Sequence, residues 1–244
     1  MHRFFYPQAG FSCPQIVLTD KAEIHHLCDV LRLKKDDLIF VFNEKNEEAQ
    51  GKILSITPQE VIIQIQKVRS GSIKLPRIIL ACALPKKGKF ELIIEKVTEL
   101  GVDEIIPMVT KRTEFFLEGK RLEQKLARFK TVALNAAKQC QRTSIPAIHP
   151  ITSFKDALVL LTKTSTVFIP SLLLERKNIL KALQNISRPE KISFLIGPEG
   201  DFTPEEYKEA QKMGCIPVSL GETILKVETA AICAIACADI FYER

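Results

Sequence analysis

Two glycine-containing loops near the end of the chain hold the residues best suited to binding a ligand. A short apolar run at residues 192–196 leads directly into the loop 197–202, and a second run at 216–220 leads into 221–230. If both runs are parallel strands, the loops lie at the carboxyl edge of one sheet, where open α/β sheets bind ligands. Neither loop contains G-x-G-x-x-G or G-x-x-x-x-G-K-S/T, the dinucleotide and nucleoside triphosphate motifs. The residues alone therefore predict a ligand crevice and leave the ligand open.

The same loop residues also have structural explanations. Gly197, Gly200 and Gly221 could serve tight turns, which glycine favours because it adopts left-handed backbone angles. Glu199 could be a solvated loop acid, and Glu228 could cap the helix that follows it. Two such loops on neighbouring strand ends favour the ligand interpretation over the turn interpretation.

Cysteine and histidine offer little for catalysis or metal binding. The seven cysteines are scattered without a C-x-x-C pair and leave one over in any disulfide scheme, so we expect reduced thiols. Cys233 and Cys237 lie one helical turn apart, but without a second pair or a nearby histidine they indicate a helix core and no metal site. His25 and His26 fit a helix of the N-terminal region better than a catalytic site.

Positive charge is concentrated in the middle of the chain. The whole chain has a net charge of +6, and residues 85–142 contain thirteen Lys or Arg against eight Asp or Glu, a net +5. A basic segment suits a polyanionic partner such as a nucleic acid, although a solvated helix face explains the charge equally well. No stretch approaches the ~20 apolar residues of a membrane span, and the N-terminus lacks the apolar core of a secretion signal, so we expect no membrane contact and a cytoplasmic protein.

The first third of the chain predicts a small β-rich domain. Asp20 and Glu23 have the spacing of a helix capping box, so we expect a helix over about 21–32. Runs rich in β-branched residues then predict a small barrel. Its expected strands are 38–42, 51–56 and 60–68, with 4–6 as a further candidate. The polar segment 69–76 resembles a linker, which divides the chain into domains 1–72 and 73–244.

The rest of the chain predicts an α/β domain. Apolar runs alternate with helical stretches, the pattern of a parallel sheet covered on both faces. The expected strands are 78–84, 104–109, 167–170, 192–196 and 216–220. The clearest expected helices are 90–100, 122–140, one that begins at the Thr203 cap, and 226–242.

Short motifs over nearly the whole chain resemble one family. GPEGDF and LGETILKVETA are similar to the two C-terminal signatures of the RsmE family of SPOUT methyltransferases, GPEGG-F and LG-x-RILR-x-ETA. HRFF, HHLCDVLRLKKDD, KVTELGVDEIIP, KRTE and AAKQCQR resemble further RsmE segments in the same order. The chain departs from the family pattern at a few positions: Asp201 replaces a glycine, Thr223 and Lys226 replace arginines, and Asn135 and Lys138 replace acidic residues.

The resemblance implies a fold and an activity. It implies a PUA-like RNA-binding domain followed by a trefoil-knotted SPOUT domain that forms a homodimer. The implied reaction is S-adenosylmethionine-dependent methylation of N3 of a specific uridine in 16S ribosomal RNA, on the free RNA or on the small ribosomal subunit. Two alternatives stay open: a protein that holds RNA without modifying it, and an enzyme that methylates the ribose 2′-oxygen.

The resemblance also assigns roles to individual residues. The expected cofactor-binding residues are Ile196, Gly197, Pro198, Glu199, Gly200, Leu220, Gly221, Ile224, Leu225, Thr229 and Ala230. The expected RNA-binding residues are Arg3, Arg32, Lys86, Lys89, Arg112 and Arg142. The uridine N3 proton is only weakly acidic, so a cation close to the base would favour the anion, by about 4 kcal/mol at 4 Å and an effective dielectric constant near 20. Lys226 and Arg3 are the candidates for this catalytic role, and no general base is identified.

Overall fold

The chain forms two compact units in the computed structural model, which describes residues 2–7, 10–72, 74–114, 118–172, 175–187 and 189–244. The first unit comprises Met1–Ile73 together with Ala137–Ile145, and the second comprises Lys74–Ala136 with Pro146–Arg244. The sequence predicted a single boundary at residue 72. It did not predict that residues 137–145 belong to the first unit. Composition cannot reveal this segment, because single polar pairs hold it: Lys138 pairs with the buried Glu23, and the Thr143 hydroxyl bonds Asn46.

The first unit is a mixed five-stranded sheet with the order β1-β3-β4-β5-β2. Its strands are β1 (Arg3–Phe5), β2 (Gln15–Leu18), β3 (Leu38–Phe42), β4 (Glu47–Ile56) and β5 (Val61–Ser70). Strand β1 pairs in parallel with β3, and the other neighbours are antiparallel. Asp20 caps the amino end of α1 (Lys21–His25), which continues as a π turn over His26–Val30. The predicted helix and strands are confirmed, whereas β2 was not predicted.

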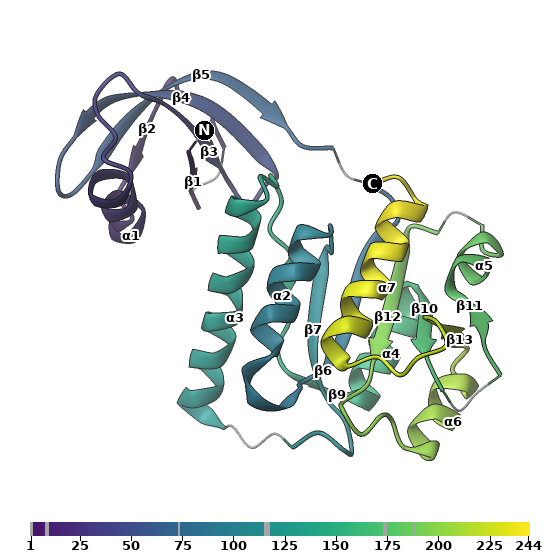
Figure 1. Cartoon of the computed structure of the whole chain (residues 1–244). Coiled ribbons are helices and arrows are strands. Elements are labelled where there is room, and N and C mark those ends of the chain that lie inside the picture. Colours follow the sequence, from purple (N-terminus) through teal and green to yellow (C-terminus); the bar gives the residue numbers. More distant parts are fainter. Residues whose placement is uncertain (1, 8–9, 73, 115–117, 173–174, 188) are drawn as a thin grey trace. The chain divides into compact units, whose positions relative to one another are not determined.

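The second unit is an α/β domain with an eight-stranded parallel sheet. The strand order is β11-β13-β10-β12-β6-β7-β8, and β9 pairs with β7 (Figure 1). The strands are β6 (Arg77–Ala83), β7 (Glu104–Val109), β8 (Ala147–Ile148), β9 (Thr152–Ser153), β10 (Thr166–Pro170), β11 (Lys177–Asn178), β12 (Lys191–Ile196) and β13 (Ile216–Ser219). The helices are α2 (Phe90–Glu99), α3 (Gly119–Gln139), α4 (Phe154–Thr164), α5 (Ile179–Gln184), α6 (Pro204–Lys212) and α7 (Val227–Phe241). The prediction of a parallel sheet with helices is confirmed.

Apolar side chains cover both faces of this sheet. Alternate residues of β6, beginning at Ile79, join one core with residues of α4 and α6, such as Phe154 and Tyr207. On the other face, α7 packs against β6, β12 and α2. Within the described residues, no helix is both long and apolar enough to cross a bilayer.

The strand order brings three strand ends together. Strand β10 lies between β12 and β13, although β12 follows β10 in the chain and β13 comes last. The segment after β10 therefore lies between the two glycine-containing loops, at the carboxyl edge of the sheet. The trefoil knot that the family resemblance implies stays a prediction.

Candidate functional site

A cavity of about 370 Å³ opens at the carboxyl ends of β10, β12 and β13, entirely within the second unit. The strand ends and the first turn of α7 provide its walls. The lining residues are Lys89, Pro170, Ser171, Leu172, Arg176, Ile196, Gly197, Pro198, Glu199, Asp201, Tyr207, Val218, Ser219, Leu220, Gly221, Thr223, Ile224, Leu225, Lys226, Val227, Glu228 and Ala230.

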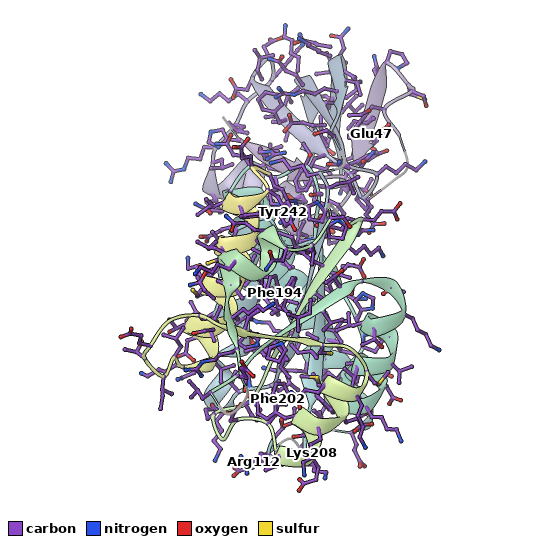
Figure 2. The ribbon with its side chains drawn as sticks, turned by 90° about the vertical axis from the view of Figure 1, so that its right-hand side faces the viewer. Glu47, Arg112, Phe194, Phe202, Lys208 and Tyr242 are labelled. Carbon is purple, nitrogen blue, oxygen red and sulfur yellow. The ribbon has the colours of Figure 1, made fainter. Side chains whose placement is uncertain are left out.

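The loop after β12 is fixed by the packing of Phe202. A Cβ added to Gly197 would lie 3.2 Å from the Phe202 ring and 3.3 Å from its backbone nitrogen, a tight contact that favours glycine there. Phe202 is fully buried, while the Arg112 guanidinium donates to the carbonyl of Gly200. Figure 2 shows Phe202, Arg112 and Lys208 towards the lower end of the view, with Phe194 above them. At Gly197 the close approach of Phe202, and no left-handed turn, favours glycine, which is compatible with a ligand on the loop's other side.

The loop after β13 differs from the loop after β12, because its glycine is surrounded by open space. Gly221 has a φ of +136°, and no atom lies within 4 Å of where its Cβ would be. The Ser219 hydroxyl donates to the Gly221 carbonyl at 2.9 Å, which closes the turn without filling the cavity. This glycine leaves backbone and space available to a ligand.

Both acidic residues singled out in these loops have fixed partners. Glu199 Oε1 accepts from the backbone N–H of Lys86 at 2.9 Å. Glu228 Oε1 lies 2.9 Å from Lys89 Nζ, and this hydrogen bond holds the pKa of Glu228 below its ordinary value. Burial raises the pKa of the Cys82 thiol beneath them, so this thiol is not a nucleophile at neutral pH. The site offers fixed charges and a cavity, and no activated thiol.

Most of the predicted cofactor-binding residues line the cavity. Those that do are Ile196, Gly197, Pro198, Glu199, Leu220, Gly221, Ile224, Leu225 and Ala230, while Gly200 and Thr229 do not. Their role as cofactor contacts stays a prediction. The sequence did not predict that Asp201 and Tyr207 line the cavity, nor that Pro170, Ser171, Leu172 and Arg176 do, because it could not place β10 between β12 and β13. The signal available was the end of the predicted strand at Pro170.

The two proposed catalytic cations have different surroundings. Lys226 lines the cavity, is exposed, and occupies the residue before the first turn of α7. Arg3 is buried in the first unit, with Nη2 2.6 Å from Glu48 Oε1 and its guanidinium 5.0 Å from the centre of the Phe42 ring. Burial lowers the Arg3 pKa, against the opposing effect of Glu48. The ion pair gives Arg3 a structural role, and its catalytic role stays a prediction.

The predicted RNA-binding residues are spread over both units. Lys86 Nζ lies 2.8 Å from Glu114 Oε1, and Lys89 pairs with Glu228 inside the cavity. In the first unit, Arg142 Nη2 donates to the Ser144 hydroxyl at 3.0 Å, and Arg32 is exposed. Their contacts with RNA stay predictions.

Comparisons with known proteins agree with the two-unit fold. Residues 73–239 match the family model of an RNA methyltransferase domain, and residues 18–66 match that of an RNA methyltransferase PUA domain. The ribosomal RNA small subunit methyltransferase E of Mesomycoplasma hyopneumoniae is 33% identical over 235 residues, which cover 95% of this chain and 96% of that protein. The protein of the same name from Bacillus subtilis is 29% identical over 219 residues, covering 88% and 86%.

Solved structures give the same result. The ribosomal RNA small subunit methyltransferase E of Neisseria gonorrhoeae, bound to S-adenosyl methionine, is 26% identical with a TM-score of 0.87, covering 98% of this chain and 97% of that one. A methyltransferase from Legionella pneumophila in complex with the same cofactor is also 26% identical with a TM-score of 0.87, covering 98% and 96%. The family model of the RNA methyltransferase domain matches more than half of the chain, and a relative 33% identical aligns over 95% of it. The chain therefore belongs to the ribosomal RNA small subunit methyltransferase E family.

Proposed function

We propose that the protein transfers the methyl group of S-adenosylmethionine to N3 of a specific uridine in 16S ribosomal RNA. The observation that carries the proposal is the cavity that the two signature loops form together at the carboxyl edge of the sheet. Family membership and the cofactor-bound relatives support it.

The cavity residues fit S-adenosylmethionine. The volume of about 370 Å³ falls within the range of small-molecule sites. The open turn at Gly221 gives access to main-chain groups, which suit an adenine, and the walls carry both a carboxylate and a guanidinium. When bound, the cofactor supplies an electrophilic methyl group. The chain's own residues bind it, exclude water and hold charge close to the target base.

The target base constrains the rest of the mechanism. N3 of uridine lies on the pairing edge, so the base must leave any pair or stack before methylation. The base must also reach the anionic form, which a cation stabilises. Lys226 is the better placed of the two candidates because it lines the cavity, whereas Arg3 is buried in the first unit and paired with Glu48.

Partners and location follow from the same proposal. A ribosomal RNA substrate, either free or in the small subunit, would place the protein in the cytoplasm and give the first unit an RNA-binding role. The sequence division 1–72 and 73–244, the trefoil knot, a homodimer and the absence of a metal are parts of the proposal.

Methyl transfer from labelled S-adenosylmethionine to small subunits that lack the modification tests the proposal. Nuclease digestion and mass analysis of the nucleosides should give 3-methyluridine. A 2′-O-methylated nucleoside would assign the reaction to the ribose. RNA binding without transfer would make the protein a binding module.

A further inference from the structure

One stretch of the cavity wall holds a carboxylate and a guanidinium that are not paired with each other. Asp201 precedes α6, and Arg176 follows the end of β10. Among the described residues, neither side chain has an ion-pair partner within 4.0 Å. Of the other acids of the cavity, Glu228 pairs with Lys89, while Glu199 accepts the Lys86 backbone N–H and has no ion-pair partner among the described residues. Two opposite charges are therefore available to a ligand here.

Asp201 is held in place by its own loop. Its φ of +62° is left-handed, a conformation that aspartate tolerates better than most residues. Its Oδ1 accepts from the Tyr207 hydroxyl at 2.7 Å and from the Phe202 N–H at 2.8 Å. Tyr207 is only 2% exposed, so it fixes the carboxylate rigidly. These bonds use Oδ1, and no described residue bonds Oδ2.

Arg176 lies close to the same tyrosine. Its Nη1 donates to the Ser171 carbonyl, and the Tyr207 hydroxyl lies 3.4 Å from the neighbouring Pro170 carbonyl oxygen. The Tyr207 hydroxyl thus contacts both the Asp201 carboxylate and the end of β10, and Arg176 bonds the residue that follows β10. The guanidinium keeps further donors for a ligand, because the carbonyl takes only Nη1.

We propose that Asp201 and Arg176 bind the amino acid end of the methionine half of S-adenosylmethionine. Asp201 takes the ammonium group and Arg176 takes the carboxylate, which suits a ligand that carries both charges on one carbon. This assignment rests on the proposed function, and it gives a purpose to the aspartate that replaces the usual glycine of the family signature. The competing explanation is that both side chains only tie the 170–176 segment to α6.

Two ligands separate these explanations by calorimetry. S-adenosylhomocysteine keeps the amino acid group, and 5′-methylthioadenosine lacks it while keeping the nucleoside. Asp201→Asn retains an acceptor for Tyr207, and Arg176→Met retains an unbranched side chain of similar reach. Each variant should weaken S-adenosylhomocysteine binding by about ten- to hundred-fold, because each loses a charge-assisted bond. Binding of 5′-methylthioadenosine should change by less than about two-fold.

Lys208→Met is the control, since it removes an exposed charge from α6 outside the cavity (Figure 2). It should leave both affinities unchanged. Equal losses for both ligands would assign Asp201 and Arg176 to structure alone, and no loss for either ligand would place the amino acid group elsewhere. Failure of the unmodified protein to bind S-adenosylhomocysteine would instead refute the proposed function.

Discussion

Gly221 tests the cofactor assignment at the scale of one residue. Changing Gly221 to Val projects a side chain into a cavity where nothing lies within 4 Å, and should lower S-adenosylmethionine affinity at least about ten-fold by calorimetry. Its φ of +136° adds local strain in any L-residue. Gly214→Val controls for strain, because Gly214 has a φ of +84°, equally open surroundings and no place in the cavity. Unchanged affinity in the Gly221 variant would refute the assignment.

Lys226 tests the proposed electrostatic role. Its ammonium is exposed, so its stabilisation of a uridine anion at about 4 Å lies between roughly 1 kcal/mol in water and 4 kcal/mol at an effective dielectric constant of 20. Lys226→Met should therefore slow single-turnover methylation by at least about five-fold, and most at low pH, where the anion is scarcest. Cofactor and RNA affinity should persist. A rate that matches the unmodified protein at every pH would leave Lys226 without a catalytic role.

Two residues that depart from the family signatures show what sequence can and cannot predict at this scale. Asp201 was recognisable as an exception, but its left-handed backbone and its bond to Tyr207 depend on where α6 packs. Lys138 stands where an acid is usual, and it pairs with Glu23 more than a hundred positions earlier. The sequence shows that Asp201 and Lys138 are unusual residues for the family. Only the folded structure shows that their partners are Tyr207 and Glu23.

The amino edge of the second sheet, opposite the cavity, is held by one acidic side chain. Glu104 of β7 contacts Arg77 of β6, Lys191 of β12 and His149 after β8, at 2.9 to 3.4 Å. The His149 hydrogen bond, with the charges of Lys191 and Arg77, lowers the pKa of Glu104 to about 2. One carboxylate thus links several strands.

This cluster predicts how stability depends on pH. The depressed pKa of Glu104 contributes stability that is complete above its unfolded value of 4.5 and is lost as the pH falls towards 2. Glu104→Gln should lower the free energy of unfolding at pH 7 by on the order of 3 kcal/mol, measured in urea. The difference between the two proteins should shrink at pH 3. An equal difference at both pH values would contradict the pKa assignment.

Elements were predictable where their pattern was local. The continuous apolar run of β7 and the apolar stripe of α2 define those elements without reference to neighbours, and both were predicted within two residues. The short strands β8, β9 and β11 were not predicted, because two residues cannot show a period. The position of β10 between β12 and β13 was unpredictable for another reason: order within a sheet is a property of the whole chain.

At the scale of the whole molecule, α7 predicts a homodimer interface. Ala231, Ala234 and Ala238 are buried within their own unit, so they leave the opposite face of the helix available. That face includes Ile240, which is 75% exposed. Light scattering at micromolar concentration should give about twice the chain mass of 27.5 kDa.

Ile240→Glu should convert the dimer to a monomer, since a charge would be buried in the interface. Leu160→Glu is the matched control: Leu160 is 45% exposed on α4, which covers the other face of the sheet. It should leave the mass unchanged. A mass of one chain for the unmodified protein would refute the proposed dimer.

RNA affinity should fall steeply with salt if, as we expect, the basic segment 85–142 binds phosphates. Lys89 is unsuitable as a test because both it and its partner Glu228 line the cavity, so changing it would also disturb cofactor binding. Arg32→Gln combined with Lys86→Gln should weaken RNA binding and reduce the slope of log affinity against log salt by about 1.4 for single-stranded RNA. Lys155→Gln with Lys163→Gln, on α4, should change neither. Filter binding at several salt concentrations measures the slope, and loss of cofactor affinity in the first pair would indicate damage to the fold.

The position of the segment 137–145 in the chain affects the order in which the two units can fold during synthesis. The chain builds most of the first unit, leaves it for sixty-odd residues, returns to add these nine, and then completes the second unit. In a nascent chain of 72 residues, Asn46 would lack its partner Thr143, and Glu23 would lack its partner Lys138. Without residues 137–145, the first unit lacks both of these polar contacts. The N-terminal unit therefore cannot reach its final stability on the ribosome until residue 145 has emerged, when a large part of the catalytic sheet is still unmade.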